Sequence, residues 1–309
     1  MLTPEELATI AETMQPHLDE LNMWISQDMI RRFMARMGRG GKDLLSGTDQ
    51  WQAQVYKEAG GLYEDLQKDL HEFTGKSEDE IKAIFEDAGI RAWNADDIFY
   101  VAQGFESIPL FSSERMLNIL TDCYQRTNNE VYNFTRTTAN ETQRRFIKLL
   151  DSTHMKVMSG AQSYTAAVKE AVNELASTQT EGIYPSGHKD TIETAGKVIY
   201  LVRTGVAQAS GNMTLQGMEE RDWDLIRVSA HLGARYGDGG ENPGNHYWWQ
   251  GKLYSRTGID KRYPDFITAT GYGTGEGLCG WNCRHSYGPG DPEHNPYKEY
   301  DAEENKKAY

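Results

Sequence analysis

The sequence predicts an α+β protein whose N-terminal two-thirds are mainly helical and whose C-terminal part is a compact, glycine-rich α+β domain with short strands. Three observations lead to this fold class. Apolar residues recur at three- and four-residue intervals through the first two-thirds of the chain, which is the period of an amphipathic helix. Near residue 220 the pattern changes to alternating and aromatic-rich stretches that are typical of strands. Glycine becomes frequent between residues 271 and 290, where it permits backbone turns that other residues avoid.

The first predicted helix covers EELATIAETMQPHLDELNMWISQDMIRRFMARM, in which apolar residues recur from Leu7 to Phe33. Such a stripe is the face that a helix buries against a core. Pro16 interrupts the stripe, and because proline lacks a backbone donor we expect it to kink or divide the helix. The segment GRGGK, residues 38–42, is expected to end the helix, since glycine readily adopts the left-handed cap conformation.

The second predicted helix spans about 51–73, and Gly60 and Gly61 within it are expected to break it. The third lies in KSEDEIKAIFEDAG. It begins at Ser77, which precedes Glu80 by the spacing of a capping box, and it closes at the glycine that ends the segment.

Further helices are expected near residues 95–105, 112–134, 139–158, 163–177 and 188–216. Ser163 and Tyr164 stand where the cap of the fourth of these belongs. We interpret the apolar stripes of all these helices as core and helix–helix contacts, because an apolar helical face must pack on something.

Two strands are predicted after the helices, in DWDLIRVSAH (222–231) and in HYWWQGKLYSRTG (246–258). The polar end EHNPYKEYDAEENKKAY is expected to be an extended arm or a frayed terminus. The predicted regions are a helical arm or assembly region (1–110), a helical bundle region (111–218), the glycine- and aromatic-rich α+β domain (219–295) and a polar tail (296–309).

The composition narrows the function classes. The chain has 309 residues and a formal net charge of −14, whereas a general binder of the nucleic-acid backbone carries a basic excess. The chain has 3 cysteines, too few for the disulfide framework of a small secreted protein, and they suit a reducing compartment. No apolar run reaches the roughly 18 residues of a membrane helix, and the acidic, amphipathic start lacks the features of a signal peptide.

The segment GEGLCGWNCRHSYGPG (275–290) holds the pattern C-x3-C-x-H. Zinc needs about four nitrogen or sulfur ligands in a tetrahedron, and two histidines upstream could complete such a set. We favour a metal-free, hydrogen-bonded loop module with no cofactor, in which Arg284 and His285 bind loop carbonyls, and keep zinc as the alternative. The candidate zinc ligands are His231, Cys279, Cys283 and His285, with His246 as a further upstream histidine.

Other chemistry has weaker support. Cys283 or Cys279 could act as a nucleophile with a histidine base, and a hydrolase centred on Glu276 has less support still. The segment GYGTGEGLCG lacks the preceding strand and following helix of a dinucleotide-binding loop. Trp248, Trp249 and Tyr254 could stack on nucleic-acid bases, although packing within a strand is the interpretation that we favour.

Three segments together resemble a known family: RVSAHLGAR (227–235), NHYWWQGKLYS (245–255) and DFITATGYGTGEGLCGWNCRHSYGPG (265–290). They are similar to the tailed-phage minor capsid protein 2 family, which is related in style to head-morphogenesis proteins of the phage Mu type. The resemblance is strong over about 225–290 and weaker over 136–183, and about the first 110 residues carry no recognisable motif. The family pattern points to His231, Arg235, His246, Trp249, Gln250, Gly251, Lys252, Gly271, Tyr272, Gly273, Gly277, Gly280, Asn282, Cys283, Arg284 and His285.

The resemblance implies a structural virion protein rather than an enzyme, located in the phage head and, during assembly, in the host cytoplasm. It implies a place at or near the portal vertex or on the inner capsid, in a few copies, with a role in head assembly and in DNA packaging or ejection. The implied partners are the portal protein, the major capsid protein and packaged DNA, without a membrane. We expect His231, Arg235, Asn282 and His285 to tie the C-terminal loops together. The alternatives are a zinc- or cysteine-dependent hydrolase or transferase delivered with the virion, and a DNA-contacting module.

Overall fold

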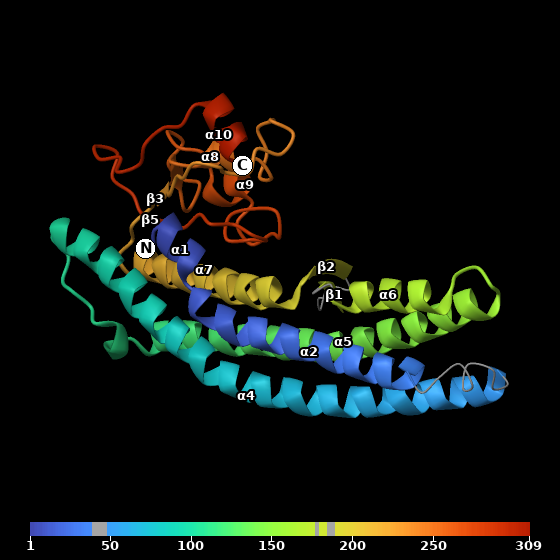
Figure 1. Cartoon of the computed structure of the whole chain (residues 1–309). Helices are drawn as coiled ribbons and strands as arrows, with labels where there is room; N and C mark the ends of the chain where they lie inside the picture. Colours follow the sequence, from blue (N-terminus) through green and yellow to red (C-terminus); the bar gives the residue numbers. More distant parts are fainter. Residues whose placement is uncertain (39–47, 177–178, 184–188) are drawn as a thin grey trace. The chain divides into compact units, whose positions relative to one another are not determined.

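The computed structural model describes residues 1–38, 48–176, 179–183 and 189–309. Its long helices precede a small three-stranded sheet near the C-terminus, which confirms the predicted fold class (Figure 1). Two compact units are present, and neither is a continuous stretch of chain. Unit 1 comprises Met1–Glu12, Glu80–Asn128 and Tyr200–Tyr309, and unit 2 comprises Thr13–Asp79 and Asn129–Ile199. The predicted boundaries at 110, 218 and 295 stay predictions.

The elements of the N-terminal two-thirds are α1 (Pro4–Thr9), η1 (Glu12–Met14), α2 (Gln15–Gly38), α4 (Thr48–Ala102), η2 (Leu110–Ser112), α5 (Glu114–Met158), α6 (Tyr164–Leu175), β1 (Gln179–Ile183), β2 (Lys189–Glu193) and α7 (Thr194–Glu220). The C-terminal elements are β3 (Leu225–Val228), α8 (His246–Trp249), β4 (Leu253–Ser255), α9 (Phe266–Thr270), β5 (Tyr287–Pro289) and α10 (Ala302–Ala308). Within the described ranges, none of the helices combines the length and the apolar character that a membrane crossing requires.

In unit 2, α2, the first part of α4, the second part of α5 and α6 run beside one another (Figure 1). Their apolar stripes meet in one core, as the helical period of the sequence predicts. Trp51 links two of the helices, because its ring stacks on His154 at 4.2 Å between centroids and its Nε1 donates to Asp151 at 3.1 Å. The core contains Leu21, Ile25, Met29, Phe33, Met37, Trp51, Val55, Leu62, Leu66, Phe146, Leu150 and Leu175.

Pro16 acts as predicted, since the N-terminal stripe is divided between α1 and α2 just before it. The proline lies in the first turn of α2, where a missing backbone donor costs nothing. The helix ends at Gly38, the first residue of GRGGK, and the rest of that segment lies outside the described residues.

The predicted breaks in the next helices are wrong. α4 continues through Gly60, Gly61 and Ser77 as one helix, and Ser77 is not a cap, because its hydroxyl donates to the carbonyl of Thr74 within the same helix at 3.0 Å. Glycine inside a helix costs only about 0.5–1 kcal/mol relative to alanine, which the surrounding core outweighs.

α5 is likewise continuous where the sequence predicts an interruption between 134 and 139. Thr138, in that gap, satisfies its hydroxyl by donating to the carbonyl of Phe134 at 2.9 Å. Ser163 caps α6 as predicted, accepting from the backbone of Ala166 at 3.3 Å. The helix expected from 188 begins instead at Thr194, and β2 precedes it.

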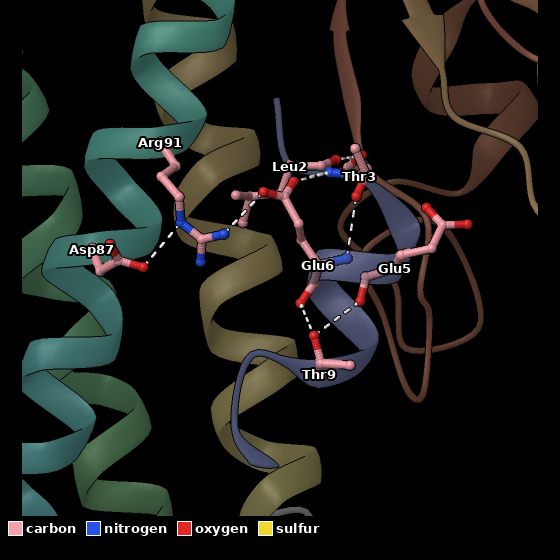
Figure 2. A network of polar contacts seen from close by, with 8 residues as sticks. Leu2, Thr3, Glu5, Glu6, Thr9, Asp87 and Arg91 are labelled. Atoms are coloured by element: carbon pink, nitrogen blue, oxygen red, sulfur yellow. Dashed lines mark hydrogen bonds and ion pairs between the residues drawn. The ribbon is translucent and has the colours of Figure 1, made fainter. Parts of the chain in front are cut away.

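The N-terminal segment is anchored inside unit 1 (Figure 2). Thr3 and Glu6 form a capping box at the start of α1, in which each side chain binds the other's backbone amide, at 3.1 Å and 2.8 Å. Arg91 of α4 donates to the Glu6 carboxylate at 2.9 Å and to Asp87 at 2.9 Å. The carbonyl of Leu2 accepts a hydrogen bond from Ser286 beside β5.

Three antiparallel strands form the C-terminal sheet in the order β4-β3-β5. β3 and β4 lie inside the two predicted strand segments, whereas β5 was not predicted and residues 246–249 form the helical turn α8. The C-terminus is not frayed, because α10 covers 302–308. The side-chain amide of Asn305 also forms two hydrogen bonds with the backbone of Ala234, both at 2.8 Å.

Candidate functional site

Three histidines and two cysteines meet beside the C-terminal sheet. His231 follows β3, His246 begins α8, and Cys279, Cys283 and His285 come from the loop that leads into β5. All five side chains are buried. The antiparallel pairing of β3 with β5 brings the residues that follow β3 next to those that precede β5, so segments about fifty residues apart share one site.

Each histidine ring binds an oxygen. His285 Nε2 lies 3.0 Å from Oε1 of Gln250, and the same oxygen accepts the backbone amide of His231 at 3.0 Å. His246 Nε2 lies 2.8 Å from the carbonyl oxygen of Glu276. Because these oxygens only accept, Nε2 carries the proton in both rings, and the Nδ1 atoms of His246 and His285 keep their lone pairs.

Cys283, His285 and Gln250 have the residue types of a cysteine nucleophile with its base and an orienting amide. Cys283 Sγ lies 3.7 Å from Nδ1 of His285. Burial raises the pKa of the Cys283 thiol and lowers the pKa of His285 well below its ordinary value. The pair is therefore a neutral thiol beside a neutral imidazole, whereas a reactive cysteine needs a depressed pKa and access to substrate.

The donor atoms of His246, Cys283 and His285 all lie within 4.8 Å of one another. Cys279 is close by, with its sulfur 3.8 Å from the carbonyl oxygen of His285, an oxygen that the sulfur of Cys283 approaches at 3.9 Å. His231, which the sequence placed among the candidate ligands, instead lays its ring against that of His285, with 4.3 Å between centroids.

Arginines tie the surrounding loops together. Arg235 donates to the carbonyls of Glu276, at 3.1 Å, and Trp281. Arg284 donates to the carbonyl of Gly233 at 3.4 Å. The side chain of Asn282 accepts from Arg203 of α7, a contact that no local sequence pattern indicates.

Close backbone approach explains two motif glycines. A Cβ added to Gly277 would lie 2.1 Å from the carbonyl oxygen of Gly271, and one added to Gly280 would lie 2.4 Å from that of Gly275. Real Cβ atoms do not approach other atoms closer than about 3 Å, so only glycine fits at either position.

The remaining motif residues pack around this loop. Trp249 is buried and donates from Nε1 to the carbonyl of Pro243 at 2.9 Å. Tyr272 donates to the side chain of Asn212 at 2.6 Å. Turn positions with positive φ are occupied by Gly251, Gly271 and Gly273.

Gln250 also lines a pocket of about 310 Å³. Lys252 places its ammonium 5.2 Å from the ring centre of Trp248. Of the aromatic residues considered as a stacking platform, Trp248 lines this pocket, whereas Trp249 and Tyr254 are buried. Its lining consists of Ala230, Tyr247, Trp248, Gln250, Gly251, Lys252, Asn295, Tyr297, Lys298, Glu299 and Tyr300.

Sequence reasoning missed two contributors. Ser229 fastens the sheet edge, because its hydroxyl accepts the backbone amide of Ser286 at 2.9 Å. The second contributor is Leu2, whose carbonyl oxygen accepts a hydrogen bond from the hydroxyl of Ser286. Serine hydroxyls of this kind carry no recognisable motif, and no local pattern links residues at opposite ends of a chain.

A model of the family described as phage minor capsid protein 2 matches residues 2–309. The match includes the N-terminal helices, in which no motif was recognised, as well as the C-terminal loops. No curated protein and no solved structure matches the chain.

Proposed function

We propose that this chain, which belongs to the phage minor capsid protein 2 family, is a structural part of the phage head that sits at the portal vertex and acts in head assembly. Family membership makes it a virion protein. Its position at the portal, its few-copy stoichiometry and a role in DNA packaging or ejection are the proposed details.

One observation carries the proposal: the family match extends over residues 2–309. This extent supports a single role for the helical part and the loop module. The chemistry of the C-terminal module agrees, because its cysteine and histidine side chains are buried, whereas turnover by a cysteine requires access to substrate.

The contact with the portal, we infer, includes apolar side chains at the end of α4 and in η2. Ile98 and Phe111 are 71% and 69% exposed, the first on the last turns of α4 and the second in η2. Asp97 holds the intervening connection against the helix by accepting the backbone amide of Ile108 at 3.1 Å. Exposed apolar side chains held in place in this way suit burial against a partner protein.

The test combines imaging with incorporation. A reconstruction of the phage head without imposed icosahedral symmetry is expected to show this chain in contact with the portal ring. Ile98→Ser and Phe111→Ser are each expected to reduce the copies per particle, counted by quantitative mass spectrometry. Ile259→Ser is the matched control, since Ile259 is 79% exposed in the C-terminal module and its loss should leave incorporation unchanged.

Several outcomes would contradict the proposal. Density spread over the whole capsid lattice would exclude the portal position. Equal incorporation of all three variants would show that Ile98 and Phe111 do not contact the portal. Turnover of a substrate by the purified chain, as expected for a hydrolase or transferase carried in the virion, would contradict the structural role.

Contact with packaged DNA is a second candidate, and the pocket beside Gln250 favours it. Lys252 and Lys298 supply positive charge there, next to the rings of Trp248 and Tyr300, and cations beside aromatic rings suit phosphates and bases. The net charge of −14 restricts such binding to a local patch. A salt titration of DNA binding should show a shallower slope for the Lys252→Ala/Lys298→Ala double variant, and equal slopes would exclude the pocket.

A further inference from the structure

The geometry points to a structural zinc site in the C-terminal module, formed by His246, Cys283 and His285 with Cys279 as the fourth ligand. Thiolate sulfur and imidazole nitrogen are the ligands that zinc prefers. Family membership says nothing of a metal, so this inference stands apart from the proposed function.

The first argument is the distance between Cys283 and His285. A zinc ion with Zn–S near 2.3 Å and Zn–N near 2.0–2.1 Å sets its tetrahedral sulfur and nitrogen ligands about 3.6 Å apart. Cys283 Sγ and His285 Nδ1 are 3.7 Å apart. This pair already has the spacing that a shared metal requires.

Ring geometry decides which histidine is the second nitrogen ligand. Two imidazoles on one tetrahedral zinc have ring centres about 5.2 Å apart, because each centre lies roughly 3.2 Å from the metal. The rings of His246 and His285 are 5.5 Å apart at 69°. The rings of His231 and His285 are 4.3 Å apart at 32°, too close and too nearly parallel for tetrahedral ligands. His246 is therefore the ligand, and His231 packs over the site.

The hydrogen bonds on the far side of both rings orient them for a metal. Metal-binding histidines usually donate their other ring N–H to a carbonyl or carboxylate, which fixes the tautomer. His246 does so to the carbonyl of Glu276 and His285 to the amide oxygen of Gln250. The amide of His231 also binds that oxygen, so Gln250 cannot flip without losing a bond. Both Nδ1 atoms are thus left as ligands.

Cys279 is the fourth zinc ligand in this proposal. Its sulfur and that of Cys283 approach the same carbonyl oxygen, at 3.8 and 3.9 Å. To bind the same ion, the Cys279 sulfur would have to move toward the other three donor atoms, which lie within 4.8 Å of one another. The side chains of the four ligands are at most 2% exposed. Burial of this degree matches a closed structural site, in which protein ligands fill all four positions.

The test is metal analysis of the full-length, untagged chain purified from zinc-containing medium without chelators. We expect about one zinc per chain in the wild type, with more than a tenfold loss of affinity in Cys283→Ser and His246→Gln. Cys123→Ser is the matched control, because Cys123 is also buried but lies in α5, and this variant should keep its zinc. Cobalt-loaded protein should show a thiolate-to-cobalt charge-transfer band that Cys283→Ser and Cys279→Ser each weaken, because each variant removes one of the two thiolates.

A chelator provides a readout that does not depend on how well the variants fold. It is expected to lower the unfolding temperature of the wild type and of Cys123→Ser, because the metal binds the folded state alone. A wild-type chain that holds no zinc after equilibration with the ion overturns the proposal. So does a zinc content in Cys283→Ser equal to that of the wild type. An unchanged cobalt band in Cys279→Ser overturns the assignment of the fourth ligand.

Discussion

Gly277→Ala tests the close packing of the C-terminal loops most directly. The added Cβ would lie 2.1 Å from the carbonyl oxygen of Gly271, 2.4 Å from its carbonyl carbon and 2.6 Å from the carbonyl oxygen of Thr270. These neighbours are backbone atoms and cannot rotate away. The two loop segments would have to separate by roughly 1 Å to restore an ordinary contact.

The expected cost follows from two contributions. Overpacking of a well-packed interior costs about 1–3 kcal/mol, and a clash with backbone belongs at the upper end. Separation of the segments also strains the hydrogen bond from the amide of Leu278 to the carbonyl of Thr270, now 3.0 Å, which contributes about 1 kcal/mol. We expect the free energy of unfolding to fall by at least ~3 kcal/mol.

Urea unfolding followed by tryptophan fluorescence measures this change. Gly60→Ala is the control, because nothing lies within 4 Å of a Cβ at that position and alanine favours a helix interior by about 0.5–1 kcal/mol. The control should therefore unfold at the same or slightly higher urea concentration. A Gly277→Ala variant as stable as the wild type would refute the close approach described for this loop.

The remaining predictions concern acid stability, a helix cap and thiol access. Burial alone would raise the pKa of Asp224, but hydrogen bonds from Ser255 and Thr257 hold this pKa below its ordinary value of 3.8. These hydrogen bonds therefore stabilise the folded chain fully above pH 3.8. Their contribution is lost as the pH falls through the lowered pKa. Asp224→Asn should therefore cost about 1–2 kcal/mol at neutral pH, a difference that shrinks in acid; a difference independent of pH would contradict the assignment. Thr3→Ala should lower the free energy of unfolding by about 1 kcal/mol in urea titrations, whereas Thr9→Ala, whose hydroxyl binds only carbonyls of its own helix, should change it little. A thiol reagent should label the native chain about a hundredfold more slowly than the unfolded chain, because all cysteines are buried; one thiol labelled at the unfolded rate would reveal an open site.

The helical stripes were predictable because they are local. The stripe from Leu21 to Phe33 became the core of unit 2, since the same residues that set the helical period also bury the face. The predicted breaks failed at Gly60 and Ser77, because breaker signals describe an isolated helix. Packing of α4 in the core of unit 2 outweighs the small local cost of such residues.

The geometry of the cluster could not be predicted in the same way. Sequence spacing brings Cys283 close to His285, but it cannot decide between His231 and His246 as the second histidine. That choice depends on the register of β3 with β5 and on the start of α8 at His246. β5 itself is only three residues long and contains glycine and proline, a composition that argues against a strand.

The hydrogen bond between Ser286 and the carbonyl of Leu2 spans 284 positions of the chain. During translation, residue 2 leaves the ribosome long before its partner has been made. The helical core of unit 2 uses only residues 13–199 and can close while synthesis continues. Unit 1 cannot fold until Tyr200–Tyr309 has been synthesised. Until then its N-terminal segment, Met1–Glu12, lacks its native contacts and is exposed to chaperones and proteases. Translation that stops before these last residues would therefore yield chains in which unit 2 is folded and the N-terminal segment is not.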